Sequence, residues 1–307
     1  MDWTAEIKAA ASRIAPYARR TPVAVLRDIG LDYPVEVKLE QMQHTGSFKA
    51  RGAFNTLLSL PVPPAGVVAA SGGNHGAAVA YAAHRLGHKA HIFVPEFAGP
   101  AKIALIRSTG AELTVLPGTY AEALAAAQEY ETRTGAMQIH AYDAPATVAG
   151  QGSLMLEWEE QGLEADTVLI AVGGGGLIGG SMAWLATRRK VVAVEPRLAP
   201  TLHTALQHGP NAKVEVSGVA ANALGAKQIG RICYGLAKAR NVQSVLVEDA
   251  AITTAQTLLW QRARLLVEPA GAAALAALLS GAYTPAQGEK IAVLICGGNI
   301  APDPLAS

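Results

Sequence analysis

Five apolar residues run directly into four glycines in Val168-Leu169-Ile170-Ala171-Val172-Gly173-Gly174-Gly175-Gly176, the most informative segment of the chain for its fold. The apolar run predicts a buried strand, and the glycines predict a turn into a following helix. Glycines let successive backbone N–H groups point into one concavity, where a helix N-terminus adds positive potential. The stretch therefore predicts a phosphate-binding turn between a strand and a helix. No Gly-Lys-Ser/Thr follows, so this turn is not a Walker loop.

A predicted strand leads directly into a glycine turn at two more places. Residues 67–70 predict a strand before Ser71-Gly72-Gly73-Asn74-His75-Gly76, and residues 291–295 predict one before Cys296-Gly297-Gly298-Asn299. Strands alternating with helices imply parallel sheets, whose ligands bind at the carboxyl ends of the strands. We therefore expect an α/β fold in which the three turns converge on one crevice. Further strands are predicted at 91–94, 112–115, 139–140 and 191–194. Helices are predicted over about 74–86, 100–108 and 145–161, and an alanine-rich helix is predicted after 112–115, ending at 131.

Composition excludes several classes of protein. Half of the 307 residues are hydrophobic, 16% are charged and the net charge is +1, which favours a globular chain without a nucleic-acid surface. The two cysteines, Cys233 and Cys296, have neither metal-site spacing nor a disulfide framework, so we expect a cytoplasmic protein. Residues 167–187 are uncharged and long enough to span a membrane. Glycines near their middle would each weaken a helix by about 1 kcal/mol, so no membrane span is expected.

Lys49 is the leading catalytic candidate, within Gly46-Ser47-Phe48-Lys49-Ala50-Arg51-Gly52. A lysine amine forms a Schiff base with an aldehyde cofactor, of which pyridoxal phosphate is the commonest in amino-acid chemistry. Taken alone, a lysine in the first turn of a helix is more often a solvated surface charge. The three glycine turns elsewhere in the chain favour the catalytic interpretation.

A dinucleotide site is the competing interpretation. Gly174, Gly176 and Gly179 satisfy Gly-x-Gly-x-x-Gly, and Glu195 follows at the end of the next predicted strand. An acid about 20 residues on binds the ribose in dinucleotide folds, so this segment alone also fits a nicotinamide-dependent dehydrogenase. That hypothesis leaves Lys49 and the other two glycine turns unexplained.

Together with Ala149-Gly150-Gln151-Gly152 and Glu268-Pro269-Ala270-Gly271, these motifs resemble the fold-type II pyridoxal-phosphate enzymes, within them the serine/threonine dehydratase and serine racemase group. The resemblance covers nearly the whole chain. It implies a tryptophan synthase β-like architecture of two α/β domains with mostly parallel sheets, and the cofactor in the crevice between them. The implied large cofactor-binding domain is 1–62 plus 145–307, and the small substrate-carboxylate domain is 63–144. A homodimer is also implied.

The resemblance also implies the role of each site residue. Lys49 carries the cofactor and takes the α-proton, Asn74 reaches the ring 3-oxygen, and Cys296 faces the pyridine nitrogen. Three simpler roles stay open: Asn74 as a helix cap, Cys296 as a small apolar residue, and Glu268 as an exposed acid at a helix start. The expected cofactor-binding residues are Phe48, Lys49, Asn74, Gly173, Gly174, Gly175, Gly176, Leu177, Glu268 and Cys296, and the expected substrate-binding residues are Ser71, Gly72, Gly73, Asn74 and His75.

The implied reaction is β-elimination from a β-hydroxy amino acid, L-threonine or L-serine, to a 2-oxo acid and ammonia. Two residues depart from the racemases of this group. Their second loop residue is a serine that serves the opposite face of the substrate, and here it is Gly72. Their divalent cation is held by the counterpart of Glu195 and an aspartate six residues later, and here that later position is Thr201, so no metal is expected. The alternatives are a racemase or other β-replacing pyridoxal enzyme, the nicotinamide dehydrogenase, and a non-catalytic pyridoxal-binding protein.

Overall fold

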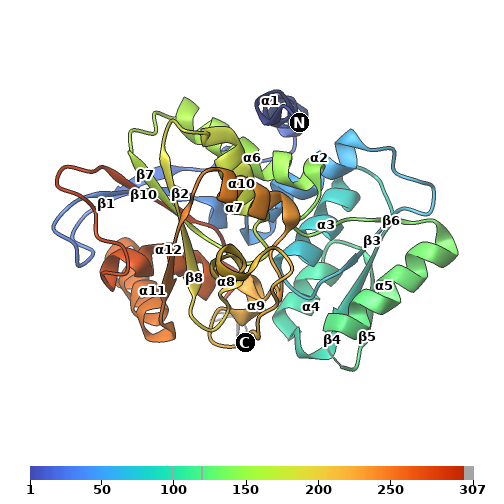
Figure 1. Ribbon diagram of the computed structural model, residues 1–307. Coiled ribbons are helices and arrows are strands. Elements are labelled where there is room, and N and C mark those ends of the chain that lie inside the picture. Colours follow the sequence, from blue (N-terminus) through green and yellow to red (C-terminus); the bar gives the residue numbers. More distant parts are fainter. Residues whose placement is uncertain (99, 119, 301–307) are drawn as a thin grey trace.

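The computed structural model describes residues 1–98, 100–118 and 120–300. It contains a six-stranded and a four-stranded sheet, which Figure 1 shows side by side with the smaller sheet at the right. The predicted α/β class with mostly parallel sheets is confirmed: β1 and β2 pair antiparallel, and the other pairings among the described strands are parallel.

The helices cover both faces of each sheet. In the larger sheet, α12 packs on one face with α11 outside it, and α7 packs on the other with α6 behind it (Figure 1). In the smaller sheet, α3 and α5 take opposite faces. The helices are α1 (Trp3–Ile14), α2 (Lys49–Ser59), α3 (Asn74–Arg85), α4 (Pro100–Arg107), α5 (Tyr120–Thr134), α6 (Pro145–Glu160), α7 (Gly176–Leu185), α8 (Thr201–His208), α9 (Ala221–Leu224), α10 (Arg231–Ala239), α11 (Asp249–Ala263) and α12 (Pro269–Leu279).

The larger sheet has the strand order β1-β2-β10-β7-β8-β9. β10 lies inside this order, and each of its apolar residues is buried. A parallel strand covered by helices on both faces must be apolar along its whole length, which explains why this strand could be predicted. The strands of this sheet are β1 (Val23–Leu26), β2 (Val35–Leu39), β7 (Thr167–Ala171), β8 (Lys190–Pro196), β9 (Gln243–Val247) and β10 (Ile291–Ile295).

The smaller sheet has the order β5-β4-β3-β6. Alternate side chains of β3 join the core under α3 and the core under α5, because successive residues of a strand point to opposite faces. The strand expected at 139–140 was misplaced: the paired residues are Met137 and Gln138, two positions earlier. The strands are β3 (Val67–Ala70), β4 (Ala90–Pro95), β5 (Glu112–Leu116) and β6 (Met137–Gln138).

The uncharged stretch 167–187 forms β7, the glycine turn and α7, as predicted. Within the described ranges, no helix is long and apolar enough to cross a membrane. The strands of the smaller sheet all fall within 63–144 and those of the larger sheet fall outside it. The division of the chain into two domains at these positions stays a prediction.

Candidate active site

Strand pairing brings the Lys49 segment and two of the glycine turns together. β10 pairs with β7 in parallel, so Cys296 and Gly173, which follow these strands, lie at the same edge of the sheet. The backbone N–H of Phe48 donates to the carbonyl of Cys296 at 3.3 Å, and Ser47 forms an isolated bridge with Gly297. The predicted convergence therefore has a direct backbone connection.

Lys49 is the first residue of α2, and its amine points inward. Nζ donates to the carbonyl of Ala141 at 2.7 Å and lies 5.2 Å from the centroid of the Phe48 ring. Burial lowers the pKa of Lys49 to about 8, although the nearby carboxylate of Glu268 acts in the opposite direction. Such an amine is partly neutral near physiological pH, as a nucleophile or a general base must be. A solvated surface charge would not show this shift.

Three carbonyls of the tetraglycine turn accept hydrogen bonds from other groups of the protein. The Gly173 carbonyl accepts from Thr201 Oγ1 at 2.6 Å, the Gly174 carbonyl from the Gly230 N–H at 3.0 Å, and the Gly175 carbonyl from the Gly179 N–H at 2.8 Å. With the carbonyls occupied, the N–H groups that lead into α7 remain for an anion. The turn thus has the character expected of a phosphate site.

Gly175 shows why the turn needs glycine. It adopts φ +91°, a left-handed conformation that L side chains rarely take, and a Cβ there would lie 2.6 Å from Cys233 Sγ. The side chain of Leu177, which was also expected in the site, packs in the hydrophobic core, so only its backbone N–H is left to face a ligand.

Asn74 joins the two sheets through its side chain. Its Nδ2 donates to Glu268 Oε1 at 2.6 Å, and its Oδ1 accepts from Asn299 Nδ2 at 2.8 Å. The helix-cap role left open for Asn74 is wrong, because Gly73 is the N-cap of α3 and Asn74 makes no capping bond. Glu268 is buried, so its role as an exposed acid is also wrong.

Two neighbours of the site were missed from the sequence. Asn299 donates to the carbonyl of Thr45 at 2.7 Å as well as to Asn74, and so fixes which way the Asn74 amide faces. Tyr142 lies against the phosphate turn, since a Cβ on Gly174 would be 2.3 Å from its Cδ1. Asn299 stands inside a recognised motif, which was the signal available. The loop Tyr142-Asp143 was a candidate for side-chain selectivity, but nothing in its sequence placed it near the glycine turn.

The Ser71–Gly76 loop leads from β3 into α3. Ser71 Oγ accepts from the Gly73 N–H at 3.2 Å, which shapes the loop. His75 is buried, and its Nε2 lies 2.8 Å from the carbonyl of Ile139. Burial, with a contribution from the Lys49 charge, lowers the pKa of His75 to about 3, so the ring is neutral and donates to that carbonyl. His75 can therefore offer a substrate its backbone N–H, at the positive end of α3.

Cys296 is buried at the end of β10, and its Sγ donates to the carbonyl of Ala270 at 3.3 Å. Burial raises the pKa of the thiol, and the charge of Glu268 raises it further, so Cys296 stays protonated. A neutral thiol is a weak hydrogen-bonding partner and not a counter-ion.

These groups fit a phosphorylated aldehyde. Lys49 supplies a buried amine, and the turn supplies backbone donors with no basic side chain among Gly173–Leu177. Ser47 Oγ, two residues before Lys49, is buried and has no hydrogen-bond partner among the described residues. Unpaired buried polar atoms are uncommon unless a ligand or water completes them.

Glu195 does not serve a dinucleotide. It is fully buried at the end of β8, and its oxygens accept from the N–H groups of Leu202 and His203, both at 2.7 Å, in the first turn of α8. A ribose-binding acid must face the ligand. The dehydrogenase hypothesis therefore lacks the ribose-binding acid that it requires.

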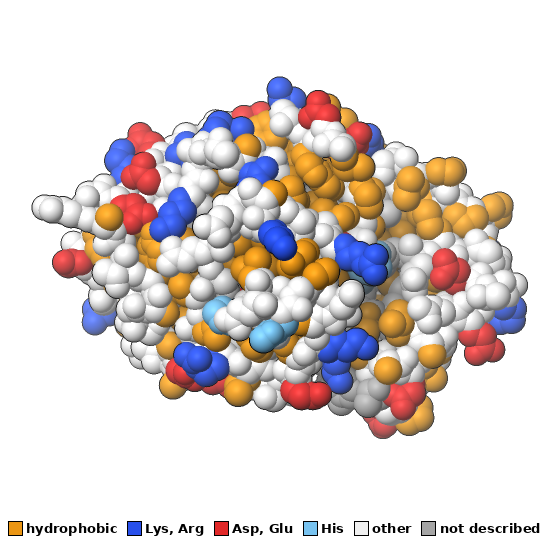
Figure 2. Space-filling model, viewed as in Figure 1, with side chains coloured by type: hydrophobic (Ala, Val, Ile, Leu, Met, Phe, Trp, Pro, Cys, Tyr) orange, Lys and Arg blue, Asp and Glu red, His pale blue; other side chains and the backbone are white. Residues whose placement is uncertain are grey.

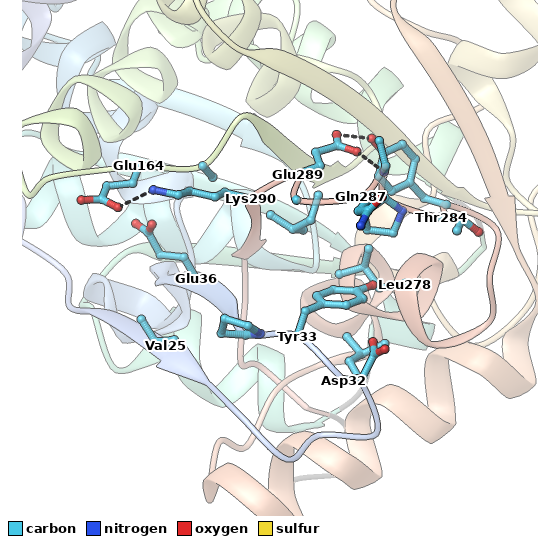
Figure 3. A pocket seen from close by; sticks show the side chains of 18 of the residues that line it. Val25, Asp32, Tyr33, Glu36, Glu164, Leu278, Thr284, Gln287, Glu289 and Lys290 are labelled. Atoms are coloured by element: carbon cyan, nitrogen blue, oxygen red, sulfur yellow. Dashed lines mark hydrogen bonds and ion pairs between the residues drawn. The ribbon is translucent and has the colours of Figure 1, made fainter.

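A groove of about 810 Å³ lies away from this site, at the amino ends of β2 and β10. Figure 3 shows Lys290 and Glu164 pointing toward each other across part of it, with a separation of 2.9 Å. Figure 2 shows acidic and basic side chains interspersed over the face in view, without an extended patch of one sign. Neither feature points to a second catalytic centre.

The geometry fits an enzyme that binds a phosphorylated aldehyde through a lysine. Residues 14–297 match the family described as pyridoxal-phosphate dependent enzyme; the chain belongs to that family, and its cofactor is pyridoxal phosphate. It is 36% identical over 301 residues to the L-threonine ammonia-lyase of Geobacter sulfurreducens, covering 96% of this chain and 75% of the relative. It is 36% identical over 295 residues to the phenylserine dehydratase of Ralstonia pickettii, covering 94% and 90%. The solved structure of maize serine racemase superposes with a TM-score of 0.90 at 31% identity, covering 97% of this chain and 93% of that one.

Proposed function

We propose that this enzyme removes water from the side chain of L-threonine or L-serine and releases a 2-oxo acid and ammonia. The observation that carries the proposal is the inward-pointing amine of Lys49, which donates to the carbonyl of Ala141 at 2.7 Å and whose pKa is lowered to about 8 by burial. An amine of this kind abstracts a proton near neutral pH. The similarity to an L-threonine ammonia-lyase and a phenylserine dehydratase supports elimination as the type of reaction.

Each part of the site has a role in this proposal. Bound pyridoxal phosphate supplies the electron sink that acidifies the α-proton of the substrate. The N–H groups of Gly173–Leu177 would hold its phosphate, and Phe48 would pack beside its ring. Asn74, oriented by Asn299, would bind the ring 3-oxygen. The loop from Ser71 to His75 holds the substrate carboxylate at the N-terminus of α3, and Lys49 takes the α-proton.

Cys296 determines the type of reaction in this proposal. Its protonated thiol beside the pyridine nitrogen offers no negative charge to hold a proton on the ring. The weaker electron sink that results favours rapid loss of the β-hydroxyl over side reactions that need a long-lived carbanion. The buried position of Glu268 beside Asn74 suits it to orient these groups.

A racemase is the second candidate, because a serine racemase structure is among the similar ones. Racemisation needs an acid–base group on each face of the substrate, and Gly72 carries no side chain to serve as the second. We therefore place elimination first. We also propose a cytoplasmic homodimer with the cofactor between the parts 63–144 and 1–62 plus 145–307; the free cysteines Cys233 and Cys296 fit a reducing compartment.

The proposal is tested by product analysis and by chemical labelling. Purified enzyme should convert L-threonine to 2-oxobutyrate and L-serine to pyruvate, each with one ammonia. Borohydride reduction followed by peptide mapping should find the cofactor on Lys49, and Lys49→Ala should abolish turnover. Lys89→Ala, a lysine outside the site, is the control. A label on another lysine, or a wild-type enzyme that forms no 2-oxo acid from any β-hydroxy amino acid, contradicts the proposal.

A further inference from the structure

The carboxylate of Glu195 is the centre of a buried hydrogen-bond cluster directly behind the phosphate turn. Its Oε1 accepts from the Leu202 N–H at 2.7 Å and lies 3.1 Å from Thr201 Oγ1. Its Oε2 accepts from the His203 N–H at 2.7 Å and from Ser244 Oγ at 3.2 Å. Each oxygen thus has two polar neighbours, and the Thr201 hydroxyl, which has a single hydrogen, lies between Oε1 and the carbonyl of Gly173.

This arrangement does not fit a divalent cation of the kind that the racemases of this group hold at the counterpart of Glu195. Divalent cations such as Mg²⁺ and Ca²⁺ need several oxygen ligands with free lone pairs, and the Glu195 oxygens face backbone N–H groups and hydroxyls. Among the described residues there is no group of three or more acidic, histidine or cysteine side chains that could hold a metal. Thr201, where the racemases have an aspartate, brings a hydroxyl in place of a second carboxylate.

Thr201 connects this cluster to the turn. Its Oγ1 donates to the carbonyl of Gly173 at 2.6 Å, which is shorter than its 3.1 Å contact with Glu195. The carbonyls of Gly174 and Gly175 are held by backbone N–H groups, whereas that of Gly173 is held by a side chain. Because the peptide plane is rigid, fixing this carbonyl also fixes the N–H of the next residue, on the side where the phosphate is proposed to bind.

We propose that Thr201 and Glu195 are positioning residues for the phosphate turn, acting through the carbonyl oxygen of Gly173, and that they do so in place of the cation that racemases of this group hold at these positions. Thr201 makes the contact, and Glu195 holds the Thr201 hydroxyl and the first turn of α8 in place. This inference rests on the proposed function of the turn as the phosphate site. It assigns a task in cofactor binding to two residues that touch neither cofactor nor substrate.

The test compares pyridoxal phosphate with pyridoxal, which has the same aldehyde and ring but no phosphate. Affinities of both are measured for the apoenzyme of the wild type, Thr201→Val, Thr201→Ser, Glu195→Gln and Thr204→Val. Thr201→Val should bind pyridoxal phosphate about tenfold more weakly, as expected for one lost hydrogen bond, and bind pyridoxal as the wild type does. Glu195→Gln should also lower the affinity for pyridoxal phosphate, because the NH₂ group of the amide would face the backbone N–H groups of α8, which are donors themselves.

Two variants provide the controls. Thr201→Ser keeps the hydroxyl and should restore the preference for pyridoxal phosphate. Thr204→Val makes the same change one turn further along α8 and should behave as the wild type. The ³¹P resonance of the bound cofactor should shift in Thr201→Val and return in Thr201→Ser, which loss of general stability would not produce. If Thr201→Val does not fold, Thr201→Ala answers the same question.

The outcomes separate this inference from the function on which it rests. A wild type without preference for pyridoxal phosphate over pyridoxal contradicts the phosphate site itself. The positioning role is wrong if the wild type prefers pyridoxal phosphate and Thr201→Val keeps that preference in full. It is also wrong if Thr201→Val lowers the affinities for pyridoxal phosphate and pyridoxal equally. Added Mg²⁺ or Ca²⁺ should leave wild-type cofactor affinity unchanged. A cation that tightens binding in the wild type but not in Glu195→Gln overturns the proposed replacement.

Discussion

Arg51, which lies two residues after Lys49, forms a buried bidentate ion pair with Glu40. Arg51 Nε lies 2.9 Å from Glu40 Oε2, and Nη2 lies 2.7 Å from Oε1. Arg51 Nη1 also contacts Glu157 at 2.9 Å, and Glu157 in turn pairs with Lys38. Burial opposes the charge on Arg51, but Glu40 and Glu157 outweigh it and raise the pKa of Arg51, so it stays charged. The cluster links the start of α2 to β2 and α6.

The first prediction concerns this cluster. Arg51→Met should lower the free energy of unfolding by about 3–5 kcal/mol, because it leaves the Glu40 carboxylate buried without its partner. Urea unfolding of the apoenzyme measures the loss. The matched control is Arg20→Met, which breaks the pair with Glu160 whose side chains are 57% and 56% exposed. That pair should contribute less than about 1 kcal/mol. Equal effects of the two variants would mean that burial of the Arg51 pair does not matter.

The second prediction is a pH dependence of cofactor attachment. Only the neutral form of Lys49 attacks the aldehyde, and its pKa is lowered to about 8 by burial. About a tenth of the amine is therefore neutral at pH 7, and about nine tenths at pH 9. The rate of covalent attachment of pyridoxal phosphate to the apoenzyme should rise about tenfold between these values and then level off.

Stopped-flow absorbance of the attached cofactor measures this rate, with free N-acetyl-lysine as the reference. An ordinary lysine has a pKa of about 10.4, so the reference rate keeps rising above pH 9. An enzyme that follows the reference, with no levelling near pH 9, would show that the amine of Lys49 is not perturbed in solution.

The third prediction concerns Cys296. Cys296→Ser should keep most of the activity, because a hydroxyl is also a neutral and weak partner for the ring nitrogen. Cys296→Asp should place a carboxylate there, stabilise a proton on the ring and increase transamination, measured as pyridoxamine phosphate formed per turnover. An unchanged ratio of transamination to elimination in Cys296→Asp would show that Cys296 does not face the ring nitrogen.

Local patterns predicted the parts of the fold whose burial is local. β10 is apolar along its whole length, and the tetraglycine stands directly after β7, so both could be recognised in a few residues. The antiparallel strands β1 and β2 and the edge strand β9 were not predicted. β1 and β9 are only partly buried. In β2, the charged residues Glu36 and Lys38 interrupt the apolar run. Such strands depend on their neighbours for stability.

Contacts between distant residues could not be predicted in the same way. The bond from Asn74 to Asn299 spans 225 residues, and the bond from Thr201 to Gly173 spans 28. The motifs identified Asn74 and Gly173, but their partners follow from how the two sheets and α8 pack. The resemblance implied which residues meet the cofactor; the structure shows which residues hold them in position.

The last prediction concerns Gly72 and the stereochemistry of the reaction. The site should convert L-serine to pyruvate with negligible D-serine, because Gly72 has no group to protonate the second face of the substrate. The structure adds a steric reason for glycine at this position. A Cβ on Gly72 would lie 2.3 Å from the Cβ of Ala98 and 2.8 Å from Val94 Cγ1. Ala98 ends the short helix η3 (Glu96–Ala98) and so fills the space that a serine side chain would need.

Gly72→Ser alone should therefore disturb the carboxylate loop, raise KM for L-serine and yield little D-serine. Gly72→Ser combined with Ala98→Gly removes the closest contact, and it should restore substrate affinity and produce D-serine alongside pyruvate. Ala98→Gly alone is the control and should keep the wild-type product ratio. Chiral chromatography of the reaction with L-serine measures all four enzymes. Substantial D-serine from the wild type would mean that another residue serves the second face, and the assignment would change from elimination to racemisation.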